Sequence, residues 1–473
     1  MLHQEPSHLL LILLLPLVLL LFGGGRPSSA LQQECSSPGA ASAAPQVRAG
    51  YWLAHSSHYS PPTQINTSLY THVYYSALPL DVGSFHVAPP PPDQLPVLAA
   101  FSATLKNKDP YLKTLLSVSS SADQQSNSSS AFAAMAGSAT SRAAFINSTI
   151  ELARTYGFDG LDLAWLFPSS PSDMANLGFL LVEWRAAIEE EAKVFSPPLL
   201  LTATVYFSAH LFDGAFDNVD YPIQAIGSSL DWVNALCFGY HSSGDVTTAD
   251  AALHDLLSHQ STSYGISSWL DAGLSPCKLV MGIPLYGRSW FLKNKMKNGM
   301  GAQVVAAGPK QKLSNQTGIM AYFEIEESLA DPAAQFTYDD RSVASYFHTG
   351  DLWVSFDSPE VVSEKIAYAS QIGLLGYFLW PISFDSRNYT ISQQASDALQ
   401  QNFASTGREG DGGYEDALTP VELPPLDLTS MKSTAIANSI QYLSAVHLCK
   451  LHSCYLFLHF ALMIVQANLL YIT

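Results

Sequence analysis

Short apolar runs of strand type alternate with longer helical stretches from about residue 46 onward. This alternation is the pattern of a parallel sheet whose strands are joined by crossover helices. Two of the helical stretches are Ser141–Tyr156 and Pro171–Val194. The strand-type runs are Val47–Trp52, Thr71–Ser76, Lys113–Val118, Gly160–Trp165, Leu199–Phe207, Trp232–Phe238, Lys278–Pro284 and Gly376–Trp380. Eight such runs predict an α/β fold in which the sheet closes into a (β/α)8 barrel.

The interval between the seventh and the eighth run is too long for a single helix. Residues 290–360 are therefore predicted to form a small α+β domain inserted between strands seven and eight, with strand-like pieces at Met320–Phe323 and Leu352–Phe356. The barrel with its insertion is expected to cover residues 46–402. Glycines and prolines beyond it predict a linker over 403–453, and residues 454–472 are apolar again.

The chain begins with an almost unbroken leucine run, Leu9–Phe22, followed by glycines and then by small residues that end at Ala30. This order predicts a signal peptide over residues 1–30. An uncut signal anchor is the alternative, but the run is shorter than the ~20 residues that a membrane-spanning helix needs. Five Asn-x-Ser/Thr triplets predict N-glycosylation, at Asn66, Asn127, Asn147, Asn315 and Asn388. Together these features favour a secreted, extracellular glycoprotein.

Composition narrows the class of partner. Hydrophobic residues make up 48% of the chain and charged residues 13%, which suits a globular protein with a sizeable core. The formal net charge of -18 argues against nucleic acid or an acidic membrane surface as a partner, because both would repel the chain. A neutral ligand such as a sugar fits this balance.

The five cysteines are scattered, so the sequence predicts no disulfide framework. Cys237 lies in an apolar run and is expected to be a buried thiol, whereas a bridge between Cys35 and Cys277 is only one of several pairings. His55 and His58 have no other metal ligands near them in sequence, and no Gly-rich loop is built to cradle phosphate. We therefore expect no metal site and no cofactor.

The stretch from Tyr156 to Pro168 is the most informative about chemistry, because it ends the predicted fourth strand at the catalytic face of a parallel barrel. Side chains alternate along a strand. One face therefore carries Leu161, Leu163 and Trp165, and the other carries Asp162, Ala164 and Leu166. The second set is predicted to point into the barrel and its mouth.

The segment Asp159-Gly160-Leu161-Asp162-Leu163-Ala164-Trp165-Leu166 resembles the strand-four motif of glycoside hydrolase family 18, and specifically of its plant class V chitinases, which reads Asp-Gly-x-Asp-x-Asp-Trp-Glu. The resemblance covers roughly residues 46–402 and includes the insertion before the eighth strand. The other matching segments are Gly50-Tyr51-Trp52, Lys113–Ser117, Val205–Ser208, Gly282–Gly287 and Gly376–Trp380. It implies the barrel fold and chitin as the substrate class.

The resemblance also implies a substrate-assisted retaining mechanism. In the family, the final Glu of the motif protonates the leaving oxygen, the Asp two residues earlier orients the N-acetyl group of the sugar, and a strand-six Tyr steadies its carbonyl. This chain has Leu166 and Ala164 at the first two positions. Leu236-Cys237-Phe238-Gly239 stands where the family has Met-x-Tyr-Asp, and the strand-three Gly-Gly has become Ser119-Ser120. The chain is therefore expected to lack catalytic residues, with Asp159 and Asp162 as supports deeper in the barrel.

Saccharides are recognised by aromatic faces with polar groups at the rim. By the resemblance, Trp380 matches the platform under the central sugar, and Tyr51, Tyr206, Tyr286 and Arg288 would line the same mouth. Packing in the core is the alternative for the tyrosines, and Arg288 could instead pair with an acid of the insertion. Three further tryptophans, Trp52, Trp165 and Trp232, are predicted to pack between strands and helices.

The prediction that results is a catalytically inactive, chitinase-like protein that binds chitin oligosaccharides. Two alternatives stay open: a weak chitinase that cleaves β-1,4 N-acetylglucosamine linkages, and a scaffold that binds another protein. The barrel also resembles the ectodomain of chitinase-related receptor-like kinases of plants, so residues 454–472 could anchor a truncated receptor ectodomain at the plasma membrane. Lys432 and Lys450 precede that segment, which is the wrong side for an extracellular barrel, and the tail could equally be translated non-coding sequence.

Overall fold

The computed structural model describes residues 46–119, 129–212, 219–241, 244–255, 258–312 and 314–406. The predicted signal peptide, the predicted apolar tail and the glycosylation triplet at Asn127 lie outside these residues. Of the predicted linker, only residues 403–406 are described, and they belong to the last helix of the barrel.

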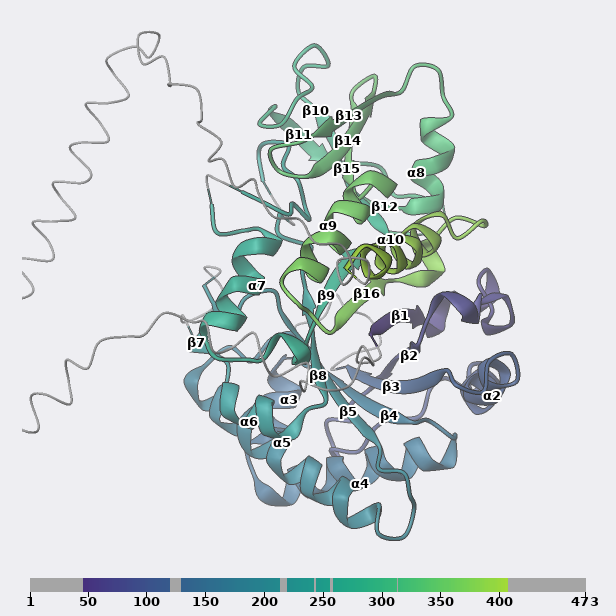
Figure 1. Cartoon of the computed structure of the whole chain (residues 1–473), viewed down its shortest axis with the longest axis vertical. Helices are drawn as coiled ribbons and strands as arrows, with labels where there is room; N and C mark the ends of the chain where they lie inside the picture. The colour runs from purple at the N-terminus through teal and green to yellow at the C-terminus, as the bar shows by residue number, and fades with distance from the viewer. Residues whose placement is uncertain are drawn as a thin grey trace, which may run out of the picture. The chain divides into compact units, whose positions relative to one another are not determined.

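Eight parallel strands close into a barrel (Figure 1). In chain order they are β1 (Val47–Leu53), β2 (His72–Pro79), β3 (Lys113–Ser119), β4 (Gly160–Ala164), β5 (Leu200–Tyr206), β8 (Trp232–Leu236), β9 (Leu279–Pro284) and β16 (Gly376–Trp380). Around the barrel the order is β1-β16-β9-β8-β5-β4-β3-β2. All eight predicted strands are therefore confirmed, and so is the predicted (β/α)8 fold.

Helices cover the outside of the barrel (Figure 1). They are α2 (Leu95–Lys106), α3 (Ser129–Ala136), α4 (Ala139–Thr155), α5 (Pro171–Glu191), α6 (Ile223–Ser229), α7 (Thr262–Asp271), α9 (Pro359–Gln371) and α10 (Thr390–Thr406). Serine N-caps fix where several of them begin, because the serine hydroxyl accepts a hydrogen bond from a free backbone N–H at the helix start. Ser138 caps α4 in this way, and Ser170 caps α5, in which Pro171 takes the first position. Within the described residues, no helix has both the length and the apolar composition needed to cross a membrane.

The insertion between β9 and β16 is a separate antiparallel sheet with one helix. Its strands are β10 (Tyr286–Leu292), β11 (Val304–Ala307), β12 (Ile319–Ala321), β13 (Gln335–Asp339), β14 (Ala344–Thr349) and β15 (Leu352–Phe356), and its helix is α8 (Tyr322–Leu329). The sheet order is β11-β10-β15-β14-β13, with β12 also paired to β10. A two-stranded hairpin, β6 (His210–Leu211) with β7 (Val219–Asp220), lies in the connection after β5.

One predicted strand of the insertion is partly wrong. The piece expected at Met320–Phe323 turns into helix α8 at Tyr322. The reason is a local cap: the Glu324 carboxylate accepts a hydrogen bond from the backbone N–H of Ala321 at 2.9 Å, which satisfies one of the free donors at the helix start. The other predicted piece, Leu352–Phe356, is β15 with the same bounds.

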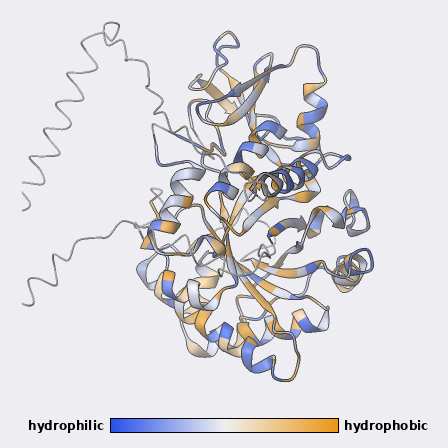
Figure 2. Cartoon of the chain, viewed as in Figure 1, coloured by the Kyte–Doolittle hydropathy of each residue, from blue (hydrophilic) through white to orange (hydrophobic). Residues whose placement is uncertain are grey.

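Apolar side chains fill two layers, one inside the barrel and one between the strands and the helices, and the strands are orange along much of their length in Figure 2. Leu161, Leu163 and Trp165 belong to the outer layer, as strand alternation predicts. Trp52 is also in the outer layer. Trp232 is buried, but it packs inside the barrel with Tyr51 and Tyr74, so its predicted place between a strand and a helix is wrong. Its indole N–H donates to Asn234 Oδ1, which lets a polar ring edge sit in the interior.

Candidate ligand-binding site

A pocket of about 260 Å³ opens at the carboxyl ends of the barrel strands. Strands β1 to β5, β8 and β16, the loops that follow them and the first residue of β10 supply its walls. The described residues that line it are Tyr51, Ser76, Ala77, Ser117, Ser119, Ala164, Leu166, Phe167, Thr204, Tyr206, Phe207, Leu236, Phe238, Gly239, Tyr240, Gln260, Tyr286 and Trp380. None of these is an Asp, Glu, His, Lys or Arg, so the described wall of the pocket carries no charge at neutral pH.

Asp162 lies below the pocket, fully buried, and is not among the lining residues. Its Oδ1 accepts a hydrogen bond from Thr202 Oγ1 at 2.8 Å, and its Oδ2 accepts one from Ser117 Oγ at 2.8 Å. The Tyr51 hydroxyl lies 3.1 Å from the same Oδ2. Burial raises the pKa of Asp162, and the hydroxyl donors oppose that rise. The carboxylate thus fixes side chains of the pocket floor, which agrees with the supporting role expected for it.

The centre of the pocket is apolar. Ala164 and Leu166 line it, on the face that strand alternation predicts. Phe238 and Gly239, which follow β8, line it as well, and the Phe238 ring makes an edge contact with Tyr286 at a centroid distance of 6.0 Å. Gly239 has a φ of +78°, a left-handed conformation that favours glycine. At these four positions the pocket therefore offers no proton donor and no carboxylate.

Four of the five predicted ligand contacts come together in the pocket: Tyr51, Tyr206, Tyr286 and Trp380. Trp380 is partly exposed, and its ring contacts the Tyr51 ring in a tilted arrangement at a centroid distance of 5.1 Å. Tyr51 itself is only 1% exposed, and its hydroxyl also accepts a hydrogen bond from Asn234 Nδ2 at 2.7 Å. Trp380 and Tyr286 are thus the more accessible rings, whereas Tyr51 belongs to the floor.

The fifth predicted contact, Arg288, is not among the described residues that line the pocket. Its Nε donates to Asp250 Oδ2 at 3.2 Å. The partner acid lies in the loop after β8, so Arg288 does form an ion pair, the alternative considered for it, but with an acid outside the insertion. Asp250 also accepts hydrogen bonds from the backbone N–H groups of His241, at Oδ1, and of Gly239 and Tyr240, at its carbonyl. Arg288 and Asp250 therefore hold the loop that carries one wall of the pocket.

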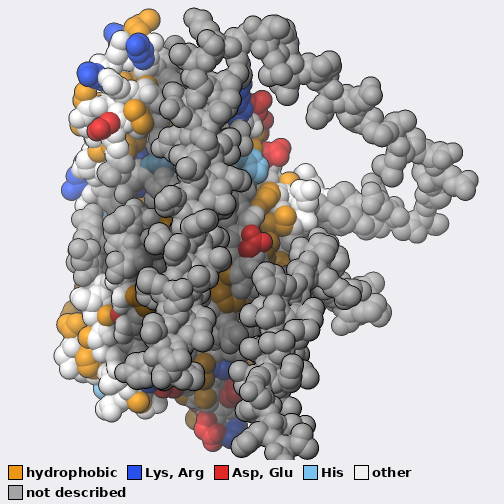
Figure 3. Space-filling model, turned by 90° about the vertical axis from the view of Figure 1, so that its left-hand side faces the viewer, with side chains coloured by type: hydrophobic (Ala, Val, Ile, Leu, Met, Phe, Trp, Pro, Cys, Tyr) orange, Lys and Arg blue, Asp and Glu red, His pale blue; other side chains and the backbone are white. Residues whose placement is uncertain are grey.

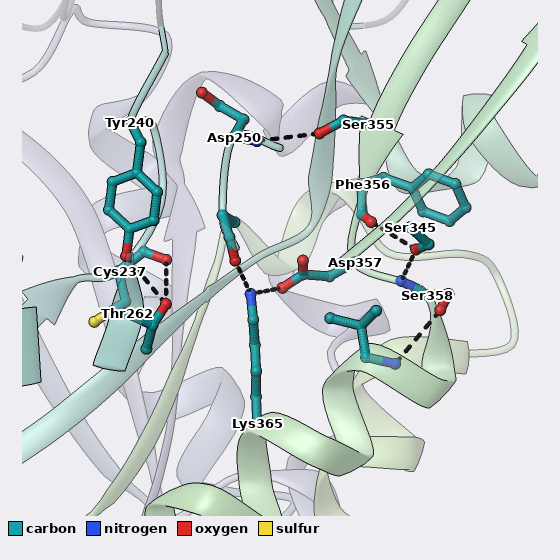
Figure 4. A network of polar contacts seen from close by, with 12 residues as sticks. Cys237, Tyr240, Asp250, Thr262, Ser345, Ser355, Phe356, Asp357, Ser358 and Lys365 are labelled. Atoms are coloured by element: carbon teal, nitrogen blue, oxygen red, sulfur yellow. Dashed lines mark hydrogen bonds and ion pairs between the residues drawn. The ribbon is translucent and has the colours of Figure 1, made fainter. Parts of the chain in front are cut away.

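A buried ion pair also stabilises the loop after β8 (Figure 4). Lys365, on α9, points toward Asp357 at the end of β15, and its Nζ donates both to that carboxylate and to the carbonyl of Ala251. Ser355 Oγ accepts a hydrogen bond from the backbone N–H of Asp250 at 3.2 Å. Burial raises the pKa of Asp357, and the Lys365 ammonium opposes the rise. The insertion, α9 and the loop after β8 are tied together by these contacts.

Asp159 lies at the other end of β4, away from the pocket. It immediately precedes that strand, accepts a hydrogen bond from the backbone N–H of Thr114 at 2.8 Å and pairs with Lys106 at 2.8 Å. It is therefore a structural group, as expected. Among the described residues, no group of three or more His, Cys, Asp and Glu side chains is placed to hold a metal ion.

The cysteine and glycosylation predictions can be followed only in the described part of the chain. Cys237 is a free, buried thiol as predicted, and burial raises its pKa to about 12. Cys277 is disulfide-bonded, and Cys35, the partner considered for it, lies outside the described residues. Three of the acceptor asparagines, Asn147, Asn315 and Asn388, are exposed, whereas Asn66 is partly buried and its side chain accepts a hydrogen bond from the backbone N–H of Ser68.

Sequence reasoning missed several lining residues. Ser117 and Thr204 could have been found, because they lie on the inward faces of predicted strands at the same period as Asp162. Phe207 ends the predicted strand Leu199–Phe207, but alternation assigns it to the face opposite Tyr206, and the observed strand ends at Tyr206. Gln260 lies between elements, where no periodicity applies, and the sequence offered no signal for it.

A model of the family described as glycosyl hydrolases family 18 matches residues 47–385. The chain belongs to this family. Nod factor hydrolase protein 1 of Medicago truncatula is 38% identical to it over 352 residues, which are 73% of this chain and 88% of that protein. The resemblance to the chitinase family is thereby confirmed, and the chain is a chitinase-like member of family 18.

Solved structures of the family share the whole barrel. A mutant chitinase of Cycas revoluta in complex with (GlcNAc)4 has a TM-score of 0.70 and 38% identity, and the match covers 74% of this chain and 99% of that one. A chitinase-like agglutinin from Robinia pseudoacacia has a TM-score of 0.66 and 32% identity, covering 75% of this chain and 99% of that one. Proteins similar to this chain thus include a family 18 chitinase solved with a chitin oligosaccharide and a protein named as a chitinase-like agglutinin.

Proposed function

We propose that this family 18 protein binds chitin oligosaccharides in the pocket at the carboxyl ends of the barrel strands and does not hydrolyse them. The observation that carries the proposal is the uncharged wall: among the described residues that line the pocket, none bears a carboxyl or imidazole group. A glycosidic oxygen in the pocket would meet Leu166 and Ala164, and neither side chain can donate a proton.

Binding is supported by the aromatic rings that remain. Trp380 and Tyr286 line a neutral, partly apolar cavity, which is the usual setting for the C–H face of a sugar. Ser117, Ser119 and Thr204 line the same pocket. The hydroxyls of Ser117 and Thr204 donate to Asp162 Oδ2, which leaves their oxygens able to accept hydrogen bonds from a polar ligand. The Cycas revoluta chitinase was solved with (GlcNAc)4, which makes N-acetylglucosamine oligomers the first ligands to test.

The absence of hydrolysis follows from how much rate a positioned acid supplies. General acid catalysis contributes typically about 10²- to 10⁴-fold. By its resemblance to the class V chitinases, this chain has lost the acid, at Leu166, together with the group that orients the N-acetyl arm, at Ala164. Residues that act as a unit are strongly non-additive, so the two losses do not simply multiply. Either loss alone is enough to make turnover slow.

Weak hydrolysis is the second candidate function, because close relatives are named as hydrolases, among them Nod factor hydrolase protein 1. An acid would then have to approach from a part of the chain outside the described residues, or Asp162 would have to leave its buried site. Asp162 is held by several hydroxyl groups and is fully buried, which argues against the second route.

Calorimetric titration of the full-length protein with N-acetylglucosamine oligomers tests the proposal. We expect saturable binding with an affinity that rises with oligomer length until the pocket is filled, and no release of reducing ends in the same samples. An oligosaccharide of the same length without N-acetyl groups is the matched ligand. Saturable binding of neither oligosaccharide would overturn the proposal and would favour the scaffold function.

We also propose that the protein is secreted, on the basis of its leader and its glycosylation triplets. N-terminal sequencing of the mature protein would be expected to start near residue 31. Attachment of the barrel to the outer face of the plasma membrane rests on residues 454–472 alone, and fractionation of cells that express the chain with and without this segment would test it.

A further inference from the structure

The insertion carries a basic tract within an acidic chain. The whole chain has 22 Lys and Arg residues against 40 Asp and Glu residues. Between Tyr286 and Phe323 there is no Asp or Glu at all. The basic residues of this tract are Arg288, Lys293, Lys295, Lys297, Lys310 and Lys312. Arg288 is bound to Asp250, but all five lysines are exposed.

The five lysines are available for a partner. None of them forms an ion pair with a carboxylate of the described residues. The Lys293 ammonium donates to the side-chain oxygen of Gln303 at 3.3 Å. The nearest segments bring two acids, Asp245 and Asp351, whose backbone carbonyls accept hydrogen bonds from β11 and β10, yet neither carboxylate is paired with a lysine of the tract.

These lysines project from the hairpin formed by β10 and β11 and from the loop that follows it; we call residues 293–312 the basic hairpin. Blue Lys and Arg side chains gather at the upper end of the view in Figure 3, the height at which β10 and β11 lie in Figure 1. The basic hairpin also exposes two apolar side chains, Met296 at 80% and Val305 at 65%. It therefore combines point charges with small apolar contacts, outside the neutral pocket.

We propose that the basic hairpin is a docking surface for an acidic polysaccharide of the polyuronate class, in which successive sugars carry single carboxylates. Charge complementarity is the first reason. The second is the flexible stem of lysine, which lets its compact ammonium reach carboxylates that are presented one per sugar, without the fixed bidentate geometry of arginine. Met296 and Val305 would contact the C–H faces of the sugars.

The proposal goes beyond oligosaccharide binding in the pocket and does not rest on it. A simpler role for the lysines would be to protect β11, which is an edge strand of the sheet, from pairing with other chains. The two roles make opposite predictions. Removal of an edge-guarding charge causes self-association, whereas removal of a docking charge weakens binding to the polymer.

The test uses the full-length protein and immobilised polygalacturonate, over a series of salt concentrations. The variant K293Q/K295Q/K297Q removes three charges from the basic hairpin. The control K193Q/R341Q/R387Q removes three exposed charges elsewhere, so both variants have the same net charge. We expect the first variant to bind at least about tenfold more weakly, since each exposed ion pair contributes a small free energy, and the control to bind like the wild type. Binding of the wild type should fade at high salt.

Four outcomes would overturn the proposal. They are no binding of the wild type at low salt, equal losses in the two triple variants, equal binding to fully methyl-esterified polymer, and tighter binding to a phosphodiester polymer of the same charge density. Self-association of K293Q/K295Q/K297Q without any binding of the wild type to the polymer would assign the lysines to protection of the edge strand. K293R/K295R/K297R, which keeps the charge, should bind like the wild type.

Discussion

Replacement of Trp380 by alanine should weaken ligand binding. An aromatic side chain buries about 150–250 Å² in total, so one face covers roughly 60–70 Å². At about 25 cal/mol per Å², loss of that face costs about 1.6 kcal/mol, and the matching face of the sugar doubles the figure. These values correspond to a dissociation constant raised by about 15- to 200-fold. Trp380 is only partly exposed and also packs against both layers of the core, so the same change should lower the free energy of unfolding as well.

The assay is calorimetric titration of (GlcNAc)4 into wild type and variant, with thermal unfolding measured on the same samples. Trp380→Phe keeps a smaller aromatic face and should lie between the two. Trp353→Phe is the matched control, since Trp353 is fully buried in the insertion, stacks on Tyr346 at 5.3 Å and does not line the pocket. It should lower the unfolding temperature and leave the dissociation constant unchanged.

The reasoning would be refuted by a Trp380→Ala variant that folds normally and binds the oligosaccharide within a factor of two of the wild type. It would also be refuted if Trp353→Phe weakened binding as much as Trp380→Ala, because both effects would then be global.

Three further changes test separate parts of the account. Leu166→Glu combined with Ala164→Asp should raise the release of reducing ends by about 10²- to 10⁴-fold over the wild type, whereas Leu166→Gln with Ala164→Asn, which lacks the proton donor, should not. Asp162→Ala leaves buried hydroxyls without their acceptor and should lower the free energy of unfolding in urea by about 3 kcal/mol; a loss below about 1 kcal/mol would contradict the supporting role. Burial lowers the pKa of His72 from 6.5 to about 4, so the unfolded chain binds a proton in this range that the folded chain does not. The free energy of unfolding should therefore fall by up to about 3 kcal/mol between pH 6.5 and pH 4, and His72→Gln should show a shallower dependence than the wild type.

The barrel could be predicted from the sequence because its strands are short, apolar and separated by helices of regular period. Gly376–Trp380 was predicted with its observed bounds for this reason. The insertion was harder to predict, because local capping there decides whether a segment forms a strand or a helix. The cap made by Glu324 at the start of α8 is an example. Trp232 was assigned to the wrong layer since periodicity alone does not say which face of a strand looks inward at that register.

At the site, strand alternation placed Ala164 and Leu166 in the pocket correctly, and the resemblance to family 18 led to Trp380, Tyr206 and Tyr286. It also led to Arg288, which instead binds Asp250 because the loop after β8 brings a buried acid beside it. That pairing depends on a contact between residues 38 positions apart in the chain, in a loop without periodicity, so no sequence pattern indicates it.

The central claim is that this family 18 barrel holds a chitin oligosaccharide and leaves it intact. The most direct test is to incubate (GlcNAc)4 with a saturating concentration of the wild-type protein, separate the complex and analyse the sugar by mass spectrometry. The account predicts that the bound tetramer is recovered whole, while a class V chitinase under the same conditions converts it to shorter oligomers. Recovery of shorter oligomers from the wild-type complex would contradict the claim.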